Sequence, residues 1–209
     1  MCGIVGYIGS RDAYPIIIKG LQRLEYRGYD SAGIAMYCDE DIKVSKTKGK
    51  VEDLRKKAES ENNQNGTLGL GHTRWATHGV PNDTNSHPHY SNSSNLVIIH
   101  NGIIENYESI KKALIGRGYE FKTDTDTEVL VNLIEEVKEK EQVKLGKAVQ
   151  IALNQVVGAY AIAVFDRTKP DEIVVAKLGS PLAIGIGENE YFIASDASPF
   201  NEYTNKAVY

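Results

Sequence analysis

The sequence has few cysteines and no long apolar run, and both features limit what the protein can be. Its 209 residues include only Cys2 and Cys38, and no stretch approaches the ~18 apolar residues that a membrane-spanning helix needs. The N-terminus lacks a basic segment followed by a long apolar one, so no signal peptide is expected and the cytoplasm is the expected compartment. In a reducing compartment the two thiols are expected to stay unpaired.

An excess of charge of one sign is also lacking. The chain carries 24 basic and 28 acidic residues, a net charge of -4, and its basic residues are dispersed. We therefore expect neither a nucleic-acid partner nor binding to an acidic membrane surface. A composition of 41% hydrophobic and 25% charged residues is typical of a globular protein, and we expect one domain over residues 2–209.

The hydrophobic pattern predicts strands toward both ends of the chain and helices in its middle. Strands are predicted at residues 2–9, 32–37, 41–47, 67–72, 95–100, 159–166, 172–178, 181–187 and 190–195, and helices at 12–26, 51–60, 106–118, 126–141 and 145–156. This order predicts an α+β protein with antiparallel sheets and helices packed outside them. The last five residues, "NKAVY", resemble the start of another strand, so a longer parent protein is expected.

A long polar stretch at residues 73–95 shows neither helical nor strand periodicity. Loops of this length are usually functional or disordered, and the presence of the only tryptophan and three of the five histidines favours function. The histidine spacings at positions 72, 78, 87 and 89 fit no common zinc pattern, and cysteine ligands are absent nearby. We therefore predict neither a metal nor a cofactor.

Cys2 opens the glycine-punctuated apolar run "CGIVGYIG", and two interpretations compete. A free cysteine in a strand is commonly a small buried hydrophobic residue. If Met1 is removed, Cys2 instead carries both a thiol and a free α-amine, with pKa values near ~8.5 and ~7.7–8.0. The amine could then accept the thiol proton, as it does for N-terminal nucleophiles.

The segment "HNGIIENY" also has two interpretations. Asn-Gly between apolar residues is a strong hairpin signal, which predicts a tight turn at Asn101-Gly102. Alternatively, the Asn101 amide and the Gly102 backbone N–H are two adjacent donors that could stabilise an oxyanion.

Two charged residues of opposite sign, Arg74 and Asp126, are further candidate site residues. Arg74 lies next to Trp75 and is suited to bidentate binding of a carboxylate, although a lone arginine is more often part of a surface ion pair. Asp126 begins a predicted helix, where Asp126 or Thr125 could simply cap the N-terminus. An amino-acid substrate needs a cation and an anion to bind its two charged groups, and these residues would supply both.

Six motifs in order resemble those of one family: "CGIVGYIG", "LEYRGYDSAGI", "GHTRWATHG", "NSHPH", "HNGIIENY" and "TDTDTEV". The chain resembles, over nearly its whole length, the N-terminal glutaminase domain of glucosamine-6-phosphate synthases, also called glutamine–fructose-6-phosphate aminotransferases (isomerizing). Among class II glutamine amidotransferases it is less similar to the amidophosphoribosyltransferase and asparagine synthetase branches.

The resemblance implies an N-terminal nucleophile (Ntn) hydrolase fold, a four-layer αββα sandwich. It further implies that Cys2, exposed after loss of Met1, attacks the side-chain amide of L-glutamine and forms a γ-glutamyl thioester. Hydrolysis of the thioester then yields glutamate and ammonia. In the family, the ammonia converts fructose 6-phosphate to glucosamine 6-phosphate in a C-terminal sugar isomerase half, which this sequence lacks.

The matched motifs also imply residue roles. Asn101 and Gly102 would form the oxyanion hole, Arg74 would bind the α-carboxylate of glutamine, and Asp126 would bind its α-amino group. The remaining implied site residues are pocket-lining Thr77 and His78, Trp75 on a closing loop at residues 73–80, Arg27 beside the nucleophile, and His87, which would order its own region.

The resemblance implies a full-length enzyme that forms homo-oligomers. Two other hypotheses remain open at this stage. The chain could supply ammonia to a different acceptor, or it could be a catalytically silent glutamine-binding or interaction module. Retention of Met1 would favour the silent module, because it would block the α-amine.

Overall fold

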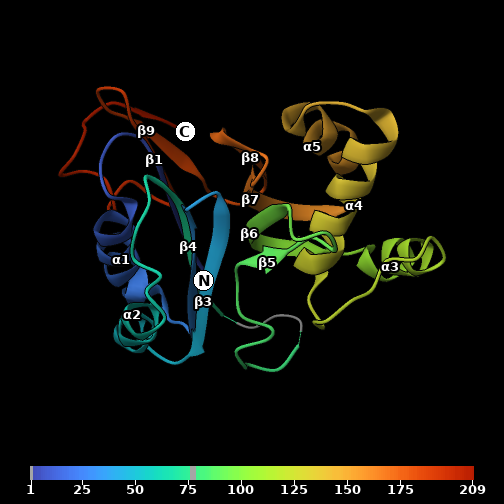
Figure 1. Ribbon diagram of the computed structural model, residues 1–209, viewed down its shortest axis with the longest axis horizontal. Coiled ribbons are helices and arrows are strands. Elements are labelled where there is room, and N and C mark those ends of the chain that lie inside the picture. Colours follow the sequence, from blue (N-terminus) through green and yellow to red (C-terminus); the bar gives the residue numbers. More distant parts are fainter. Residues whose placement is uncertain (1, 76–78) are drawn as a thin grey trace.

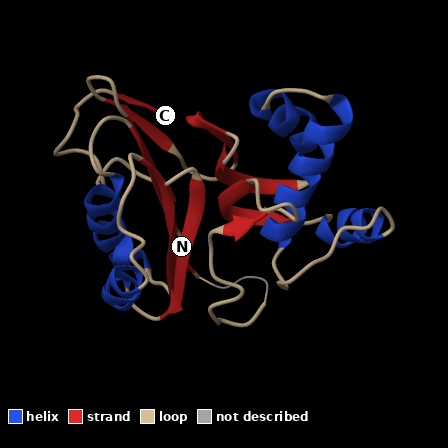
Figure 2. Ribbon diagram, viewed as in Figure 1, coloured by secondary structure: helices blue, strands red, loops and turns tan. Residues whose placement is uncertain are grey.

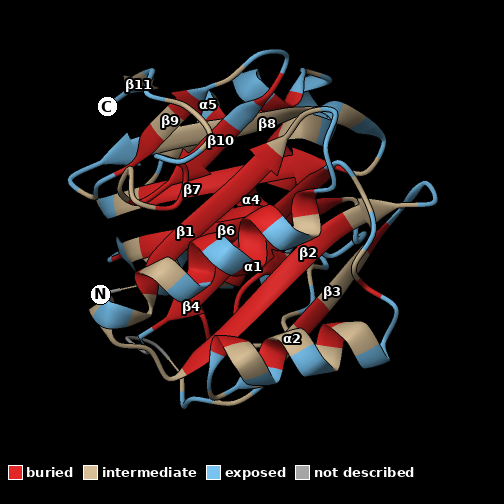
Figure 3. Cartoon of the chain, turned by 90° about the vertical axis from the view of Figure 1, so that its left-hand side faces the viewer, coloured by how far each residue is buried: buried red, intermediate tan, exposed pale blue. Residues whose placement is uncertain are grey.

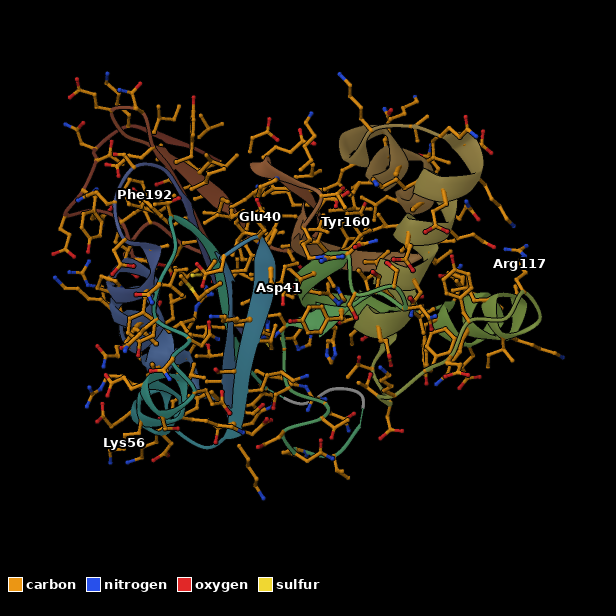
Figure 4. All side chains as sticks on the ribbon, in the orientation of Figure 1. Glu40, Asp41, Lys56, Arg117, Tyr160 and Phe192 are labelled. Carbon is orange, nitrogen blue, oxygen red and sulfur yellow. The ribbon has the colours of Figure 1, made fainter. Side chains whose placement is uncertain are left out.

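The computed structural model describes residues 2–75 and 79–209. Two antiparallel sheets stack face to face, and helices cover their outer faces, as Figures 1 and 2 show. Side chains of the two helical sides, such as Lys56 on α2 (Val51–Ser60) and Arg117 after α3 (Tyr107–Ile115), project at opposite ends of the molecule (Figure 4).

The first sheet has seven strands in the order β11-β9-β10-β1-β4-β2-β3. Its strands are β1 (Gly3–Ile8), β2 (Ser31–Cys38), β3 (Asp41–Lys48), β4 (Leu68–Arg74), β9 (Ala183–Ile186), β10 (Tyr191–Ala194) and β11 (Ala207–Val208). Helices α1 (Ala13–Leu24) and α2 pack on its outer face, and the 3-10 helix η1 (Glu25–Arg27) follows α1. Figure 3 looks onto this face, where the central strands are buried and the outward sides of both helices are exposed.

The second sheet has the order β5-β6-β7-β8. Its strands are β5 (His89–Tyr90), β6 (Leu96–Ile104), β7 (Gly158–Asp166) and β8 (Lys169–Leu178). Helices α4 (Asp126–Glu141) and α5 (Leu145–Leu153) cover its outer face, and α3 packs against α4 (Figure 1).

Three apolar layers separate the four layers of secondary structure. One lies between α1 and the first sheet, one between the two sheets, and one between the second sheet and α4. Leu70 and Ile99, from β4 and β6, both belong to the layer between the sheets. The burial of these apolar side chains drives the stacking. This arrangement confirms the expected α+β sandwich.

Two of the helices, α1 and α4, begin with a side-chain cap. The Asp12 side chain accepts a hydrogen bond from Tyr14 N at 3.2 Å, and Thr125 Oγ1 accepts one from Glu128 N at 3.3 Å. Of the two capping candidates for α4, Thr125 is therefore the one that caps, and Asp126 is the first helical residue.

The two cysteines, Cys2 and Cys38, are both free, as the sequence predicted. Within residues 2–75 and 79–209, no helix is long and apolar enough to cross a bilayer. Strand β11 confirms the strand expected in the last five residues.

Two interpretations of the sequence were wrong. The stretch at residues 73–95 is not irregular throughout, because β4 extends to Arg74 and β5 covers His89–Tyr90. Asn101 and Gly102 do not form a hairpin turn, because β6 continues through them to Ile104. Asn101 pairs with Ala161 and Gly102 with Tyr160 on β7. The long ladder with β7 pairs one edge of this segment, and so it overrides the local turn preference.

Candidate active site

The site forms where strands from both sheets meet the start of α4. Cys2 immediately precedes β1, which runs antiparallel to β4 with Gly3 opposite Thr73. The start of β1 therefore lies beside the end of β4, and the Cys2 Sγ accepts a hydrogen bond from Trp75 N at 3.1 Å. A cysteine and an arginine motif about 70 residues apart are thus neighbours because of strand pairing.

Alternation along β4 decides which side chains face the site. The β4 glycines face the helix side, where a Cβ on Gly71 would lie 2.4 Å from Ile17 Cγ2. Leu70 faces the second sheet, and His72 and Arg74 continue this face because side chains alternate along a strand. Polar groups therefore replace apolar ones at the end of the inter-sheet layer.

Strand β6 contributes from the other sheet by the same alternation. Ile99 lies between the sheets, whereas Ile98 faces α4. Asn101 continues the inner face, and its Nδ2 donates to the Cys2 carbonyl oxygen at 3.1 Å. His100 continues the outer face, and its Nδ1 lies 2.9 Å from Thr127 Oγ1 on α4.

Gly102 occupies a position that only glycine fits. Its φ is +135°, and an added Cβ would lie 2.0 Å from the carbonyl oxygen of Ala159. The absence of a side chain therefore permits both the strained backbone and the close approach of β7. It also leaves Gly102 backbone atoms lining a cavity with Cys2.

Arg74 and Asp126 line this cavity together with Cys2 and Gly102. Both are nearly fully buried, at 3% and 4% exposed. Arg74 Nη2 donates to Gly79 O at 3.1 Å, and Asp126 Oδ2 accepts from Ile104 N at 2.8 Å. The cavity thus has a cation and an anion on its walls, the pair of charges that an α-amino acid requires.

Burial raises the pKa of the Cys2 thiol above its ordinary value, although the Trp75 N–H and the Arg74 charge act in the opposite direction. The thiol is therefore mainly protonated at neutral pH, and it needs a base before it can act as a nucleophile. Burial also lowers the pKa of Arg74, with Asp30, Cys2 and Asp126 opposing the shift.

Arg27 and Trp75 lie beside Cys2, and Trp75 lines the cavity already described. Arg27 Nη1 donates to the Cys2 carbonyl oxygen at 3.3 Å, and its Nη2 lies 3.6 Å from Asp196 Oδ2. Trp75 is 56% exposed, and its ring lies against Gly28. Both residues line a second cavity, together with Cys2, Asn101, Gly102, Ile103, Ser180 and Pro181.

Four histidines form a buried cluster at the site, and two of them, His87 and His100, line its cavity. The other two are His72 and His89. The rings of His72 and His87 stack with centroids 4.2 Å apart, and His87 Nε2 lies 2.9 Å from Thr127 Oγ1. Among the described residues, no group of three or more His, Cys, Asp or Glu side chains is arranged to hold a metal ion.

The structure therefore brings six expected site residues to one cavity: Cys2, Arg74, Trp75, His87, Gly102 and Asp126. Asn101 and Arg27 lie beside it and contact the Cys2 carbonyl oxygen. Thr77 and His78 lie outside the described residues. Sequence reasoning missed Thr127 and His100 and the second cavity's Ser180 and Pro181. Thr127 belongs to the quoted motif "TDTDTEV", so a signal existed for it, whereas residues 180–181 belong to none of the six motifs.

Comparison with known proteins identifies the class. A family model described as glutamine amidotransferase domain matches residues 58–208. The structure of glutamine phosphoribosylpyrophosphate amidotransferase from B. subtilis superposes with a TM-score of 0.83 at 30% identity, covering 97% of this chain and 44% of that one. A structure described as the allosteric regulatory enzyme of purine biosynthesis gives a TM-score of 0.85 at 31% identity. The chain belongs to the glutamine amidotransferase domain family.

Other relatives are more similar in sequence than these two structures. Glutamine–fructose-6-phosphate aminotransferase (isomerizing) of Bacteroides thetaiotaomicron is 60% identical over 210 residues, which are 100% of this chain and 34% of the relative. The enzyme of the same name from Chlorobaculum tepidum is 52% identical, again with 34% of the relative covered. The chain thus spans about a third of the length of these relatives. These matches confirm the family resemblance and the Ntn-hydrolase fold.

Proposed function

We propose that this chain, after removal of Met1, hydrolyses the side-chain amide of L-glutamine to glutamate and ammonia. The observation that carries the proposal is one cavity lined by a thiol, a buried guanidinium and a buried carboxylate, at Cys2, Arg74 and Asp126. A thiol next to two groups that can bind the charged ends of an amino acid is suited to attack its side chain.

The first chemical step is formation of a thioester. The buried thiol has a raised pKa and is protonated, so a base must remove its proton. The α-amine of the processed Cys2 takes this proton, directly or through a water. The thiolate attacks the amide carbon, and the Asn101 Nδ2 and Gly102 N–H stabilise the oxyanion. The ammonium form of the α-amine then protonates the leaving nitrogen, and ammonia departs.

The second step regenerates the enzyme. The same α-amine, again neutral, removes a proton from a water that attacks the thioester carbon. The second oxyanion occupies the same position as the first, so Asn101 and Gly102 act in both steps. Collapse of this intermediate expels the Cys2 sulfur, which takes the proton back from the ammonium form of the α-amine, and releases glutamate.

Substrate selection rests on the two charges. Arg74 binds the α-carboxylate and Asp126 the α-ammonium group, so that only a side chain of suitable length reaches Cys2. Trp75, Thr77 and His78 are proposed to complete the pocket. Arg27 supports the Cys2 backbone through its 3.3 Å hydrogen bond, and His87 supports α4 through Thr127.

We further propose fructose 6-phosphate as the acceptor of the ammonia, in a sugar isomerase half of a longer, homo-oligomeric parent protein. Identities of 60% and 52% to aminotransferases named for this sugar phosphate support it. The phosphoribosylpyrophosphate amidotransferase match makes another acceptor the second candidate, but its identity is only 30%. The chain alone is expected to release ammonia to solvent.

Two measurements test the proposal. Glutamate release from L-glutamine should be readily detected for the purified chain and absent for Cys2→Ala, whose circular dichroism and urea unfolding should match those of the parent. Hydrolysis retained by Cys2→Ala would refute the mechanism. An intact mass that includes Met1, together with no turnover, would instead favour the silent glutamine-binding module.

A further inference from the structure

His72 is fully buried near the end of β4, and its ring meets the Asn101 side chain. Its Nε2 lies 2.9 Å from Asn101 Oδ1 and 3.0 Å from the His100 carbonyl oxygen. Both neighbours accept hydrogen bonds and cannot donate them. Nε2 must therefore carry the ring hydrogen, which fixes the tautomer of His72.

The other end of the Asn101 carboxamide is fixed by the same reasoning. Asn101 Nδ2 donates to the Cys2 carbonyl oxygen at 3.1 Å, and a carbonyl oxygen only accepts. Rotation of the Asn101 carboxamide by half a turn would place its NH2 group against the His72 N–H. It would also place its oxygen against the Cys2 carbonyl oxygen. Both contacts would become repulsive in a buried site, so His72 and Cys2 jointly select one orientation.

We propose that His72 is a positioning residue for amide hydrolysis, whose Nε2–H holds the Asn101 carboxamide with its NH2 group directed at the Cys2 side. The inference rests on the proposed function, in which that NH2 group stabilises the oxyanion. The group has two hydrogens, and the Cys2 carbonyl oxygen uses one. The second is then available for the oxyanion that forms on the substrate.

The surroundings of the ring keep this tautomer in place. Nδ1 of His72 has no hydrogen-bond partner among the described residues, and its ring stacks on His87. A hydrogen on Nδ1 would therefore be buried without an acceptor, which is unfavourable. Burial lowers the pKa of His72 to about 3, and the hydrogen bonds of its ring to Asn101 and the His100 carbonyl oxygen oppose this shift only in part. The ring is thus neutral at the pH at which the protein works.

Kinetics of paired variants test the role. His72→Gln can place an amide N–H near the position of Nε2, whereas His72→Met fills similar space without a donor. For His72→Met we expect kcat to fall at least about tenfold, but by less than the ~100- to 1,000-fold typical of losing an oxyanion donor outright. KM should change little, because the donor acts mainly in the transition state, and His72→Gln should recover much of the loss.

Two controls separate positioning from packing. Leu70→Met alters the same face of β4 and should leave kcat within about twofold of the parent. Alkylation of Cys2 by iodoacetamide forms no oxyanion, so its rate should be unchanged in His72→Met. In an Asn101→Ala background, His72→Met should cause little further loss of kcat. A full further loss there, or a loss of the alkylation rate, would overturn the inference.

Nitrogen-15 NMR of the histidine rings tests the geometry without any variant. We expect the His72 signals to report a neutral ring with hydrogen on Nε2, unchanged between about pH 5 and pH 8. Hydrogen on Nδ1 would overturn the inference even if glutamine is hydrolysed. A parent chain without glutaminase activity would refute the proposed function, and with it the catalytic role of His72, whatever the tautomer.

Discussion

Three buried histidines at the site, His72, His87 and His89, predict a loss of stability in mild acid. Burial lowers the pKa of His72 to about 3 and holds the pKa values of His87 and His89 well below their ordinary range. The Arg74 charge acts in the same direction on all three rings. In the unfolded chain these rings titrate with a pKa of about 6.5. Their contribution to stability is therefore complete above that pH and is lost as the pH falls toward the folded pKa values.

The magnitude follows from proton linkage. A histidine that is neutral when folded, with an unfolded pKa near 6.5, changes the free energy of unfolding by about 1.4 kcal/mol between about pH 7.5 and pH 5.5. Three such rings lower it by about 4 kcal/mol, a large part of the ~5–15 kcal/mol of a typical domain. Carboxylates interfere little in this window. Burial raises the pKa of Asp166, but hydrogen bonds from Lys138 and Thr168 outweigh burial and lower this pKa. The contribution of Asp166 to the stability of the fold is therefore lost only below about pH 4.

Urea unfolding at the two pH values measures the effect. The parent chain should be about 4 kcal/mol less stable at the lower pH, and His89→Gln should show a dependence smaller by about 1.4 kcal/mol. Ile99→Val is the control, because it removes one buried methyl group and should lower stability equally at both pH values. Equal stability of the parent at the two pH values, or an unchanged dependence in His89→Gln, would refute the reasoning.

Three further predictions concern the site. Arg74→Met and Asp126→Asn should each weaken glutamine binding by about 3 kcal/mol, which raises KM roughly 100-fold. Steady-state kinetics against glutamine concentration measure this, and an unchanged KM would contradict the prediction. Asn101→Ala should lower kcat by about 100- to 1,000-fold with little change in KM, and a wild-type kcat would exclude an oxyanion role. Gly102→Ala should lower the free energy of unfolding by about 3 kcal/mol, because its Cβ would lie 2.0 Å from Ala159 O. Urea unfolding measures this, and a variant as stable as the parent would contradict the prediction.

Much of the architecture was predictable because the helices and strands have clear local periodicity. The sequence placed α1 at residues 12–26, and the structure has it at Ala13–Leu24, where Asp12 caps the first turn. One exception was β5, whose two residues are too few to show periodicity. Another was Asn101-Gly102, where a local turn signal competes with pairing to β7. That pairing joins residues about 60 apart in the chain, so nothing near Asn101 in the sequence indicates it.

The site was predictable only in part. Chemistry and charge pointed to Cys2, Arg74 and Asp126, and the family motifs added Asn101 and Gly102 with their expected roles. The link from His72 to Asn101 was not predictable, because it depends on which faces of β4 and β6 meet between the sheets. The sequence suggests only a metal-ligand role for His72, and the histidine spacing does not support it.

The central claim is that Cys2, with a free α-amine, is the nucleophile of a glutamine-specific pocket. Its most direct test is mass spectrometry of the purified chain after reaction with an electrophilic glutamine analogue. The account predicts a protein mass without Met1 and one adduct located on Cys2, with labelling prevented by excess glutamine. An adduct on Cys38 or elsewhere, or labelling of Cys2 that glutamine does not prevent, would contradict it.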